Sequence, residues 1–400
     1  MICATKEIDE MREIVRNKIL DEVEKFGDLS DEEIQEIIDN EIISLDKSVT
    51  LTYNTRRKLR RELFHAIRKL DILQELLETP EITEIMINGT DSIFIERSGR
   101  LEENEFRFES KEKLNNVIQQ IVADCNRTVN EASPIIDARL ENGARVNIVL
   151  NPVALNGPIV TIRRFPEQPI VMDDLVSYGA LSGKMADFLS EAVRQGLSII
   201  ISGGTGSGKT TFLNVLSNFI PACERIITIE DSAELQILNI PNLVKLETRG
   251  SNVEGCREIT IRDLIKTALR MRPDRIVVGE VRGVEAIDLL QAMNTGHPGS
   301  MSTIHANSAK DMISRLETMV LMGTPLPLIA IRKQIASGIQ LAVQLGRLSD
   351  SSRKVLEIGR IVGFERDEIK MIPVFRLVEQ GEDSTGRIKV SWEETDERVL

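Results

Sequence analysis

The stretch ISGGTGSGKTTFLNVLSNFI, residues 201–220, decides the fold of this chain. From Gly203 it reads G-G-T-G-S-G-K-T, a complete match to the phosphate-binding pattern G-x-x-x-x-G-K-[ST]. The apolar run before the glycines predicts a strand, and TTFLNVLSNF after them predicts a helix. Glycine adopts backbone conformations that other residues avoid, so successive N–H groups of the loop can point at phosphate oxygens. Because the glycines lie between a strand and a helix, we expect a nucleoside triphosphate site and not merely a glycine-rich turn.

The residues of this loop have expected roles toward ATP and Mg²⁺. Lys209 would reach the β- and γ-phosphates, and the Thr210 hydroxyl would bind Mg²⁺. The N-terminus of the following helix favours negative charge as well. The residues expected to hold the nucleotide are Gly203, Gly204, Thr205, Gly206, Ser207, Gly208, Lys209, Thr210 and Thr211.

Composition limits the classes of protein to which this chain can belong. It has 400 residues, more than one hydrophobic core usually supports, so two or three domains are expected. Its formal net charge of -13, with one Trp and two Tyr, disfavours a nucleic-acid partner. The four cysteines form no C-x-x-C pair, and the N-terminus lacks the basic-then-apolar pattern of a signal peptide. We therefore expect a cytoplasmic protein that binds no nucleic acid.

Hydrophobic periodicity divides the chain into segments of different type. Residues 1–75 predict helices, one of them starting after Ser30 in a capping-box pattern. Residues 76–165 combine short strand runs with an amphipathic helix and predict an α+β domain. The prolines of FPEQPIVMDDL make residues 166–176 the predicted linker. In residues 177–400, apolar strand runs alternate with helices before C-terminal strands, which indicates a parallel sheet covered on both faces.

Acidic side chains follow two predicted strands of this sheet. In open α/β sheets the carboxyl ends of the strands line the ligand crevice. ERIITIEDSAEL places Glu230 and Asp231 there, where they could bind Mg²⁺ or polarise water. A lone Glu-Asp pair is usually a helix cap, but this position in the crevice favours the functional role. In RPDRIVVGEVRG, Glu280 follows the strand RIVV, whereas Asp274 precedes it at the end away from the nucleotide. We therefore expect Glu280 to be the main catalytic carboxylate.

Two of the three histidines flank one further strand run, in NTGHPGSMSTIHANSA. A neutral imidazole can donate to a γ-phosphate and report its loss. Metal binding is the alternative, but no cysteine or paired histidine stands at ligand spacing. A single histidine is more often part of a core. For His305, at the end of the strand, we favour the role of phosphate sensor.

These motifs, in this order, resemble those of the traffic ATPases that power type II and type IV secretion and type IV pili. The resemblance covers roughly residues 75–375. It is greatest to the CpaF/TadA-type motors of tight-adherence (Flp) pili, because ITEIMING and PIIDARLENGARVNIVLNP are similar to that subfamily. It implies a homohexameric ring in which a smaller α+β (PAS-like) N-terminal domain and a RecA-like domain enclose ATP. It also implies inner-membrane platform proteins as partners and a peripheral location at the cytoplasmic face of the inner membrane.

The resemblance assigns roles to particular residues. Glu280 corresponds to the Walker B glutamate, Glu230 lies in the Asp box, and His305 with its companion His297 corresponds to the His box. Arginines of the N-terminal domain commonly reach the phosphates in this family. Any one of them alone is more often a surface or strand-pairing residue, but as a group they are candidates for charge-stabilising fingers. These arginines are Arg139, Arg145, Arg163 and Arg164.

Three other functions share part of this pattern. A helicase or recombinase has the same RecA-like core, a nucleotide-gated scaffold binds without hydrolysis, and a small-molecule kinase also has a phosphate-binding loop. The acidic composition and scarce aromatics disfavour the first, both glutamates argue against the second, and the third lacks an evident acceptor site or lid. The resemblance, supported by these observations, implies a hexameric, Mg²⁺-dependent ATPase that drives pilus assembly or secretion.

Overall fold

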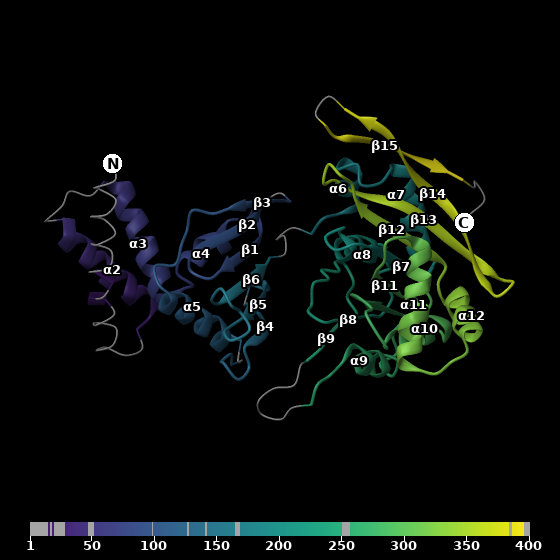
Figure 1. Cartoon of the computed structure of the whole chain (residues 1–400), viewed down its shortest axis with the longest axis horizontal. Coiled ribbons are helices and arrows are strands. Elements are labelled where there is room, and N and C mark those ends of the chain that lie inside the picture. The colour runs from purple at the N-terminus through teal and green to yellow at the C-terminus, as the bar shows by residue number, and fades with distance from the viewer. Residues whose placement is uncertain are drawn as a thin grey trace. The chain divides into compact units, whose positions relative to one another are not determined.

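The computed structural model describes residues 15–16, 18–19, 29–46, 52–97, 99–125, 128–140, 142–164, 169–249, 257–383 and 386–395. The chain forms two compact units, Met1–Glu167 and Gln168–Leu400, each with its own hydrophobic core (Figure 1). Across the described ranges, no helix is both long enough and apolar enough to cross a membrane. The N-terminal stretch expected to lack a signal peptide lies, through residue 14, outside these ranges.

One helix of the first unit begins after Ser30, as the sequence predicts. The Glu33 N–H donates to Ser30 Oγ at 3.3 Å, and the Ser30 N–H donates to the Glu33 carboxylate at 2.7 Å, which is the predicted capping box. α2 packs on α3 through buried apolar side chains such as Ile38 and Leu63. The helices described in this unit are α2 (Asp31–Asp46), α3 (Tyr53–Arg68), α4 (Ile72–Glu78) and α5 (Lys111–Asp124).

The sheet of the first unit is antiparallel throughout. Its strand order is β3-β2-β1-β6-β5-β4. Alternate residues of β1, β2, β5 and β6 are buried, and α5 contributes Leu114, Ile118 and Ile121 to the same core. Gly89, with φ of 71°, lies in the turn between β1 and β2. The strands are β1 (Ile82–Asn88), β2 (Ser92–Arg97), β3 (Arg100–Glu103), β4 (Ile135–Arg139), β5 (Arg145–Val149) and β6 (Ile159–Arg163).

The second unit is built on a sheet whose order, in the described residues, is β15-β14-β13-β12-β7-β11-β10-β8-β9. From β12 to β9 all neighbours are parallel, whereas β13, β14 and β15 extend the sheet as an antiparallel meander. The strands are β7 (Ile199–Gly203), β8 (Ile226–Glu230), β9 (Leu243–Glu247), β10 (Arg275–Val278), β11 (Met301–His305), β12 (Leu341–Arg347), β13 (Arg353–Glu365), β14 (Glu368–Glu382) and β15 (Ile388–Glu394).

Helices cover both faces of this sheet, as fully buried strands require. Every residue of β7, β8 and β10 is buried. α7 and α8 pack in one apolar cluster with one face of the sheet, and α9 to α12 pack in another (Figure 1). The helices are α6 (Met172–Ser177), α7 (Gly183–Arg194), α8 (Lys209–Ser217), α9 (Ile261–Ala268), α10 (Ala286–Asn294), α11 (Ala309–Gly323) and α12 (Leu328–Gly338).

The predicted fold class is confirmed: a RecA-like α/β unit follows a smaller α+β unit with helices before it. The boundary between the compact units falls at residues 167 and 168, inside the predicted linker 166–176. The second half of that predicted linker is helical and packed, not an extended connecting segment. It forms α6, whose Met172 and Leu175 pack in the core of the second unit because apolar residues there recur at helical spacing.

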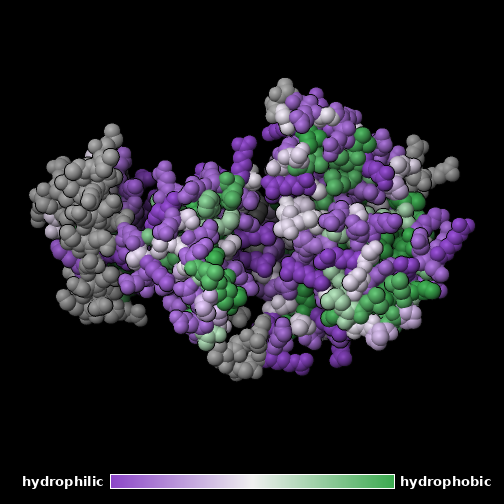
Figure 2. Space-filling model, viewed as in Figure 1, coloured by the Kyte–Doolittle hydropathy of each residue, from purple (hydrophilic) through white to green (hydrophobic). Residues whose placement is uncertain are grey.

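The surface is mainly hydrophilic in the view of Figure 2, with smaller hydrophobic areas. Four exposed apolar side chains flank the turn from α11 to α12, at the end of the first helix and the start of the second. They are Leu321, Met322, Leu328 and Ile329.

Candidate active site

The phosphate-binding loop connects β7 to α8, as the sequence predicts. β7 ends at Gly203 and α8 begins at Lys209. Gly206 and Gly208 have φ of 70° and 92°, values that side chains disfavour. A Cβ atom on Gly203 would lie 2.7 Å from the carbonyl oxygen of Leu345, so β7 passes too close to β12 for any other residue. The backbone path itself therefore requires these glycines.

Lys209 lies against this loop with little exposure to solvent. Its side chain is 7% exposed, and Nζ donates to the Gly204 carbonyl at 2.9 Å. The same Nζ lies 3.5 Å from Nδ1 of His305. Thr210 and Thr211 follow in the first turn of α8. The predicted nucleotide-binding residues thus lie together in one loop and one helical turn.

The expected catalytic side chains stand at neighbouring strand ends. β7, β11, β10 and β8 are adjacent and parallel, so their carboxyl ends meet at one edge of the sheet. Glu230 ends β8, Glu280 follows β10, and His305 ends β11 directly beside Gly203 of β7. Asp274 precedes β10 at the opposite edge, as expected.

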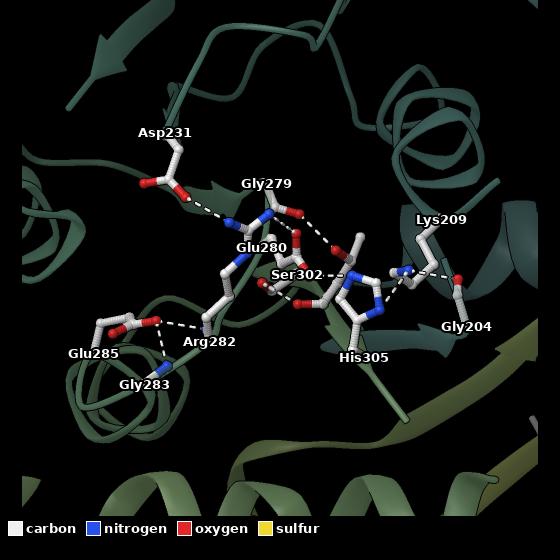
Figure 3. A network of polar contacts seen from close by, with 11 residues as sticks. Gly204, Lys209, Asp231, Gly279, Glu280, Arg282, Gly283, Glu285, Ser302 and His305 are labelled. Atoms are coloured by element: carbon white, nitrogen blue, oxygen red, sulfur yellow. Dashed lines mark hydrogen bonds and ion pairs between the residues drawn. The ribbon is translucent and has the colours of Figure 1, made fainter. Parts of the chain in front are cut away.

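A chain of polar contacts joins the loop to Glu280 (Figure 3). His305 Nε2 lies 2.8 Å from Glu280 Oε1, and its Nδ1 faces Lys209. On the other side, Arg282 Nη2 donates to Glu280 Oε2 at 2.7 Å. Arg282 Nη1 also lies 3.8 Å from the Asp231 carboxylate. The carboxylate expected to activate water is therefore held between an imidazole and a guanidinium.

His305 has the surroundings of a neutral imidazole. Burial lowers its pKa, and nearby Lys209 lowers it further, while Glu280 acts in the opposite direction. A neutral ring fits the contact with Lys209, because Nδ1 can accept from the ammonium. Nε2 lies close to Glu280 Oε1, although that oxygen has no hydrogen-bond partner among the described residues. The histidine thus lies between the lysine and the glutamate and within 3.5 Å of each.

Arg282 is a site residue that sequence reasoning missed. The hydrogen bond to Glu280 raises the pKa of the Arg282 guanidinium. The turn that carries it is fixed by Glu285, whose Oε1 accepts from the N–H groups of Arg282 and Gly283 at 2.6 and 2.8 Å. The signal in the sequence was its place in GEVRG, two residues after Glu280, at the same end of β10.

Glu230 is a buried carboxyl group. It is 3% exposed, and Oε1 accepts from the N–H groups of Glu234 and Leu235 at 2.8 and 3.0 Å. Oε2 is buried without a hydrogen-bond partner among the described residues. Burial raises the pKa of Glu230 to about 7, although the backbone hydrogen bonds oppose this. A Cβ atom on Gly279 would lie 3.0 Å from Cγ of Glu230. This close approach explains the glycine before Glu280.

The predicted Mg²⁺ ligands form no dense cluster. The described residues contain no group of three or more His, Cys, Asp or Glu that could hold a metal ion. Such sparse ligation suits Mg²⁺, which usually keeps several waters and binds one or two protein groups plus phosphates. The Thr210 hydroxyl, the exposed Asp231 carboxylate and the unpartnered Oε2 of Glu230 fit this type of site.

The four arginines predicted to reach the phosphates fall into two groups. Arg139, Arg145 and Arg163 are register partners on β4, β5 and β6, so they form a row across three adjacent strands. Arg163 also lies 3.6 Å from Glu84 of β1. Arg164 differs, because its Nη1 donates to the Ile82 carbonyl at 3.0 Å and also to that of Thr79. These bonds favour a structural role for Arg164, which joins the end of α4 to β1.

His297 does not join the site in the second unit. It lies before β11, at the amino end of the strand, whereas His305 lies at its carboxyl end. Its Nδ1 is 3.3 Å from the Ala292 carbonyl at the end of α10. The expected pairing of the two histidines therefore finds no support in the geometry, because a strand of five residues separates them.

Comparison with protein families matches residues 67–388 to the family described as "Type II/IV secretion system protein". The chain belongs to this family. Its predicted membership of the secretion ATPase superfamily is thereby confirmed, whereas special closeness to the CpaF/TadA motors stays a prediction.

Known members of the type II/IV secretion family resemble the chain over most of its length. A conjugal transfer protein of Mycobacterium tuberculosis is 35% identical over 294 residues, which cover 72% of this chain and 83% of the relative. The type IV secretion system protein PtlH of Bordetella pertussis is 33% identical over 317 residues, covering 72% and 93%. The solved ATPase DotB of Legionella pneumophila has 26% identity and a TM-score of 0.53, covering 71% of this chain and 78% of DotB. The predicted enzyme class, an ATPase, is confirmed by the family and its solved ATPases.

Proposed function

We propose that this chain is a Mg²⁺-dependent ATPase that works as a homohexamer and powers assembly of a Flp/Tad-type type IV pilus or protein secretion. The observation that carries the proposal is the chain of contacts from Lys209 through His305 to Glu280, beside a complete phosphate-binding loop. Its place of action would be the cytoplasmic face of the inner membrane, with platform proteins of the machine as partners. The relatives named for conjugal transfer and type IV secretion support this setting.

In the proposed reaction, water attacks the γ-phosphorus of ATP, the bond from this phosphorus to the β,γ-bridging oxygen breaks, and ADP leaves. Backbone N–H groups of the loop and the Lys209 ammonium bind the phosphates. Glu280 orients the attacking water and accepts its proton. Thr210 and, through water, Glu230 and Asp231 would hold Mg²⁺, which would supply positive charge that offsets the phosphates. The chain's own residues thus bind, orient and take up the proton.

In this proposal, nucleotide binding changes the contacts of Glu280 through Lys209 and His305. A bound phosphate competes for the Lys209 ammonium, which now donates to the Gly204 carbonyl and faces His305. When the Lys209 ammonium turns to the phosphate, the His305 imidazole loses its positively charged neighbour. The ring can then rotate, which changes its contact with Glu280. The glutamate then becomes available for water. This sequence of contacts makes hydrolysis depend on a correctly bound triphosphate.

The arginine row of the first unit supports a shared site. Like charges at directly opposed positions on neighbouring strands repel one another. Arg139, Arg145 and Arg163 occupy such positions, so the row places three positive charges on adjacent strands, where an anionic ligand would be attracted. We extend the proposal to these residues as groups that neutralise the phosphates of ATP bound by the same or an adjacent chain. Arg164 and His297 are left out of the proposed site.

Ring assembly follows if neighbouring chains complete each other's sites. Heterologous contacts form a closed ring when their rotation closes. The apolar side chains that flank the turn from α11 to α12 are of the kind found at interaction surfaces. Opening and closing of such a ring on nucleotide exchange would perform the mechanical work.

Light scattering after size-exclusion chromatography, together with ATPase assays, tests the ring. Activity per chain should rise with protein concentration, and ATP analogue with Mg²⁺ should shift the chain to a species of about six subunits. The Lys209→Ala variant, which cannot hold the phosphates, should show no such shift. A monomer that hydrolyses ATP at full specific activity at every concentration would contradict the proposal.

A further inference from the structure

An arginine from the C-terminal strands lies against the phosphate-binding loop. Arg353 is the first residue of β13, and its Nε donates to the Gly206 carbonyl at 2.8 Å. Its Cδ would lie 3.6 Å from a Cβ atom on Gly208, so the side chain follows the outer wall of the loop. Within the described residues, the guanidinium has this one hydrogen bond. The donors on its two Nη atoms are thus available to a ligand.

The segment that carries Arg353 is anchored on both sides. The Asp350 carboxylate accepts from the Ser352 N–H and from the Ile388 N–H of β15, each at 2.9 Å. Lys354 Nζ donates to the Gly179 carbonyl at 2.7 Å, after the end of α6. A side chain on such a segment is positioned before any ligand binds, which lowers the entropy lost on binding.

The strand order places Arg353 and the hydrolytic residues on opposite sides of the loop. β7 lies between β11, which carries His305, and β12. β13 follows β12 on that second side. If the γ-phosphate of a bound triphosphate lies near His305 and Glu280, the side of the loop next to β12 and β13 is left for its α-phosphate. Arg347, directly opposite Arg353 in the β12–β13 pair, adds a second positive charge at this end.

We propose that Arg353 is a nucleotide-binding residue that holds Gly206 through Nε and donates from its Nη atoms to the α-phosphate of ATP or ADP. This proposal rests on the proposed nucleotide site and adds a contact from the C-terminal strands. Arginine suits both tasks at once because its guanidinium presents several donors in one rigid plane. The C-terminal meander thereby becomes part of the nucleotide site.

Two substitutions separate the tasks of this arginine. Glutamine carries an N–H donor at the side-chain position of arginine Nε, so Arg353→Gln can keep the bond to Gly206 while losing the charge and the Nη donors. Arg353→Ala loses both. The control is Arg376→Ala, on β14 of the same meander, where the arginine lies 3.9 Å from Glu357.

Calorimetric titration of the full chain with Mg²⁺ and ADP gives the test. Arg353→Gln and Arg353→Ala should each weaken ADP binding by about tenfold or more, since charge-assisted hydrogen bonds to phosphate are lost. Steady-state assays should show a KM for ATP raised by a similar factor, with kcat within about threefold of wild type. Arg376→Ala should bind and turn over like wild type.

The outcomes distinguish this proposal from the proposed function. A wild-type chain that binds no ADP contradicts the nucleotide site itself. Wild-type affinity in Arg353→Gln, with or without a loss in Arg353→Ala, overturns the phosphate contact, because the Nη donors would then contribute nothing. A fall in kcat at unchanged KM in Arg353→Gln overturns it as well.

Discussion

Glu230 should make the stability of the second unit depend on pH. Burial raises the pKa of this carboxyl group from 4.5 to about 7 in the folded chain. Between these values the folded state holds a proton that the unfolded state has released, so the free energy of unfolding falls as pH rises through this interval. The difference corresponds to about 3 kcal/mol once both states are ionised. The stabilisation from this group is therefore present in full below pH 4.5, decreases as pH rises, and is lost once the pH passes about 7.

The Glu230→Gln variant removes this titration while keeping the shape of the protonated acid. Between about pH 5 and about pH 8.5, wild type should lose about 2 to 3 kcal/mol of unfolding free energy relative to the variant. Denaturant titrations without nucleotide or Mg²⁺, followed through Trp392 fluorescence, measure this. Trp392 is the only tryptophan of the chain and lies on β15, so the signal reports on the second unit alone.

The matched control is Glu247→Gln, on β9 directly beside Glu230 and exposed to solvent. It should keep the pH dependence of wild type. If the free energy of unfolding varied with pH in the same way for wild type and Glu230→Gln, the reasoning would be refuted, because the buried carboxyl group would then make no pH-dependent contribution.

Two further predictions concern arginines of the two units. Arg275 is 2% exposed and donates from Nη2 to Glu224 at 2.7 Å, so Arg275→Ala should lower the free energy of unfolding by about 3 to 5 kcal/mol; a loss below about 1 kcal/mol in denaturant titrations would contradict this. Arg145→Ala should reduce ATP turnover by about tenfold or more with little change in nucleotide affinity, while Arg164→Ala should mainly lower the melting temperature. Unchanged turnover for Arg145→Ala would remove this arginine from the proposed site.

The core of the site could be predicted because each part is encoded locally. The loop lies between an apolar strand and a helix within twenty residues of sequence, 201–220. Glu230, Glu280 and His305 each follow an apolar strand, and parallel strands bring their carboxyl ends to one edge whatever their order. The capping box at Ser30 is equally local, since both of its hydrogen bonds lie within three residues.

Contacts between distant segments could not be predicted in the same way. Arg353 reaches Gly206 from 147 positions away, through a strand order that no local pattern encodes. Arg164 resembled the other arginines until its bond to the Ile82 carbonyl was visible. The resemblance pairs His297 with His305, but the strand between them puts His297 at the opposite edge of the sheet.

The central claim is that Glu280 carries out ATP hydrolysis at the carboxyl edge of the parallel sheet, and a comparison across β10 tests it most directly. Glu280→Gln and Asp274→Asn change carboxyl groups at opposite ends of this strand. Single-turnover hydrolysis and ATP binding should be measured for both variants and wild type. We predict that Glu280→Gln binds ATP within about threefold of wild type but hydrolyses it about 100-fold more slowly or worse, while Asp274→Asn matches wild type. Near-normal hydrolysis by Glu280→Gln would contradict the account and move the catalytic role to another group.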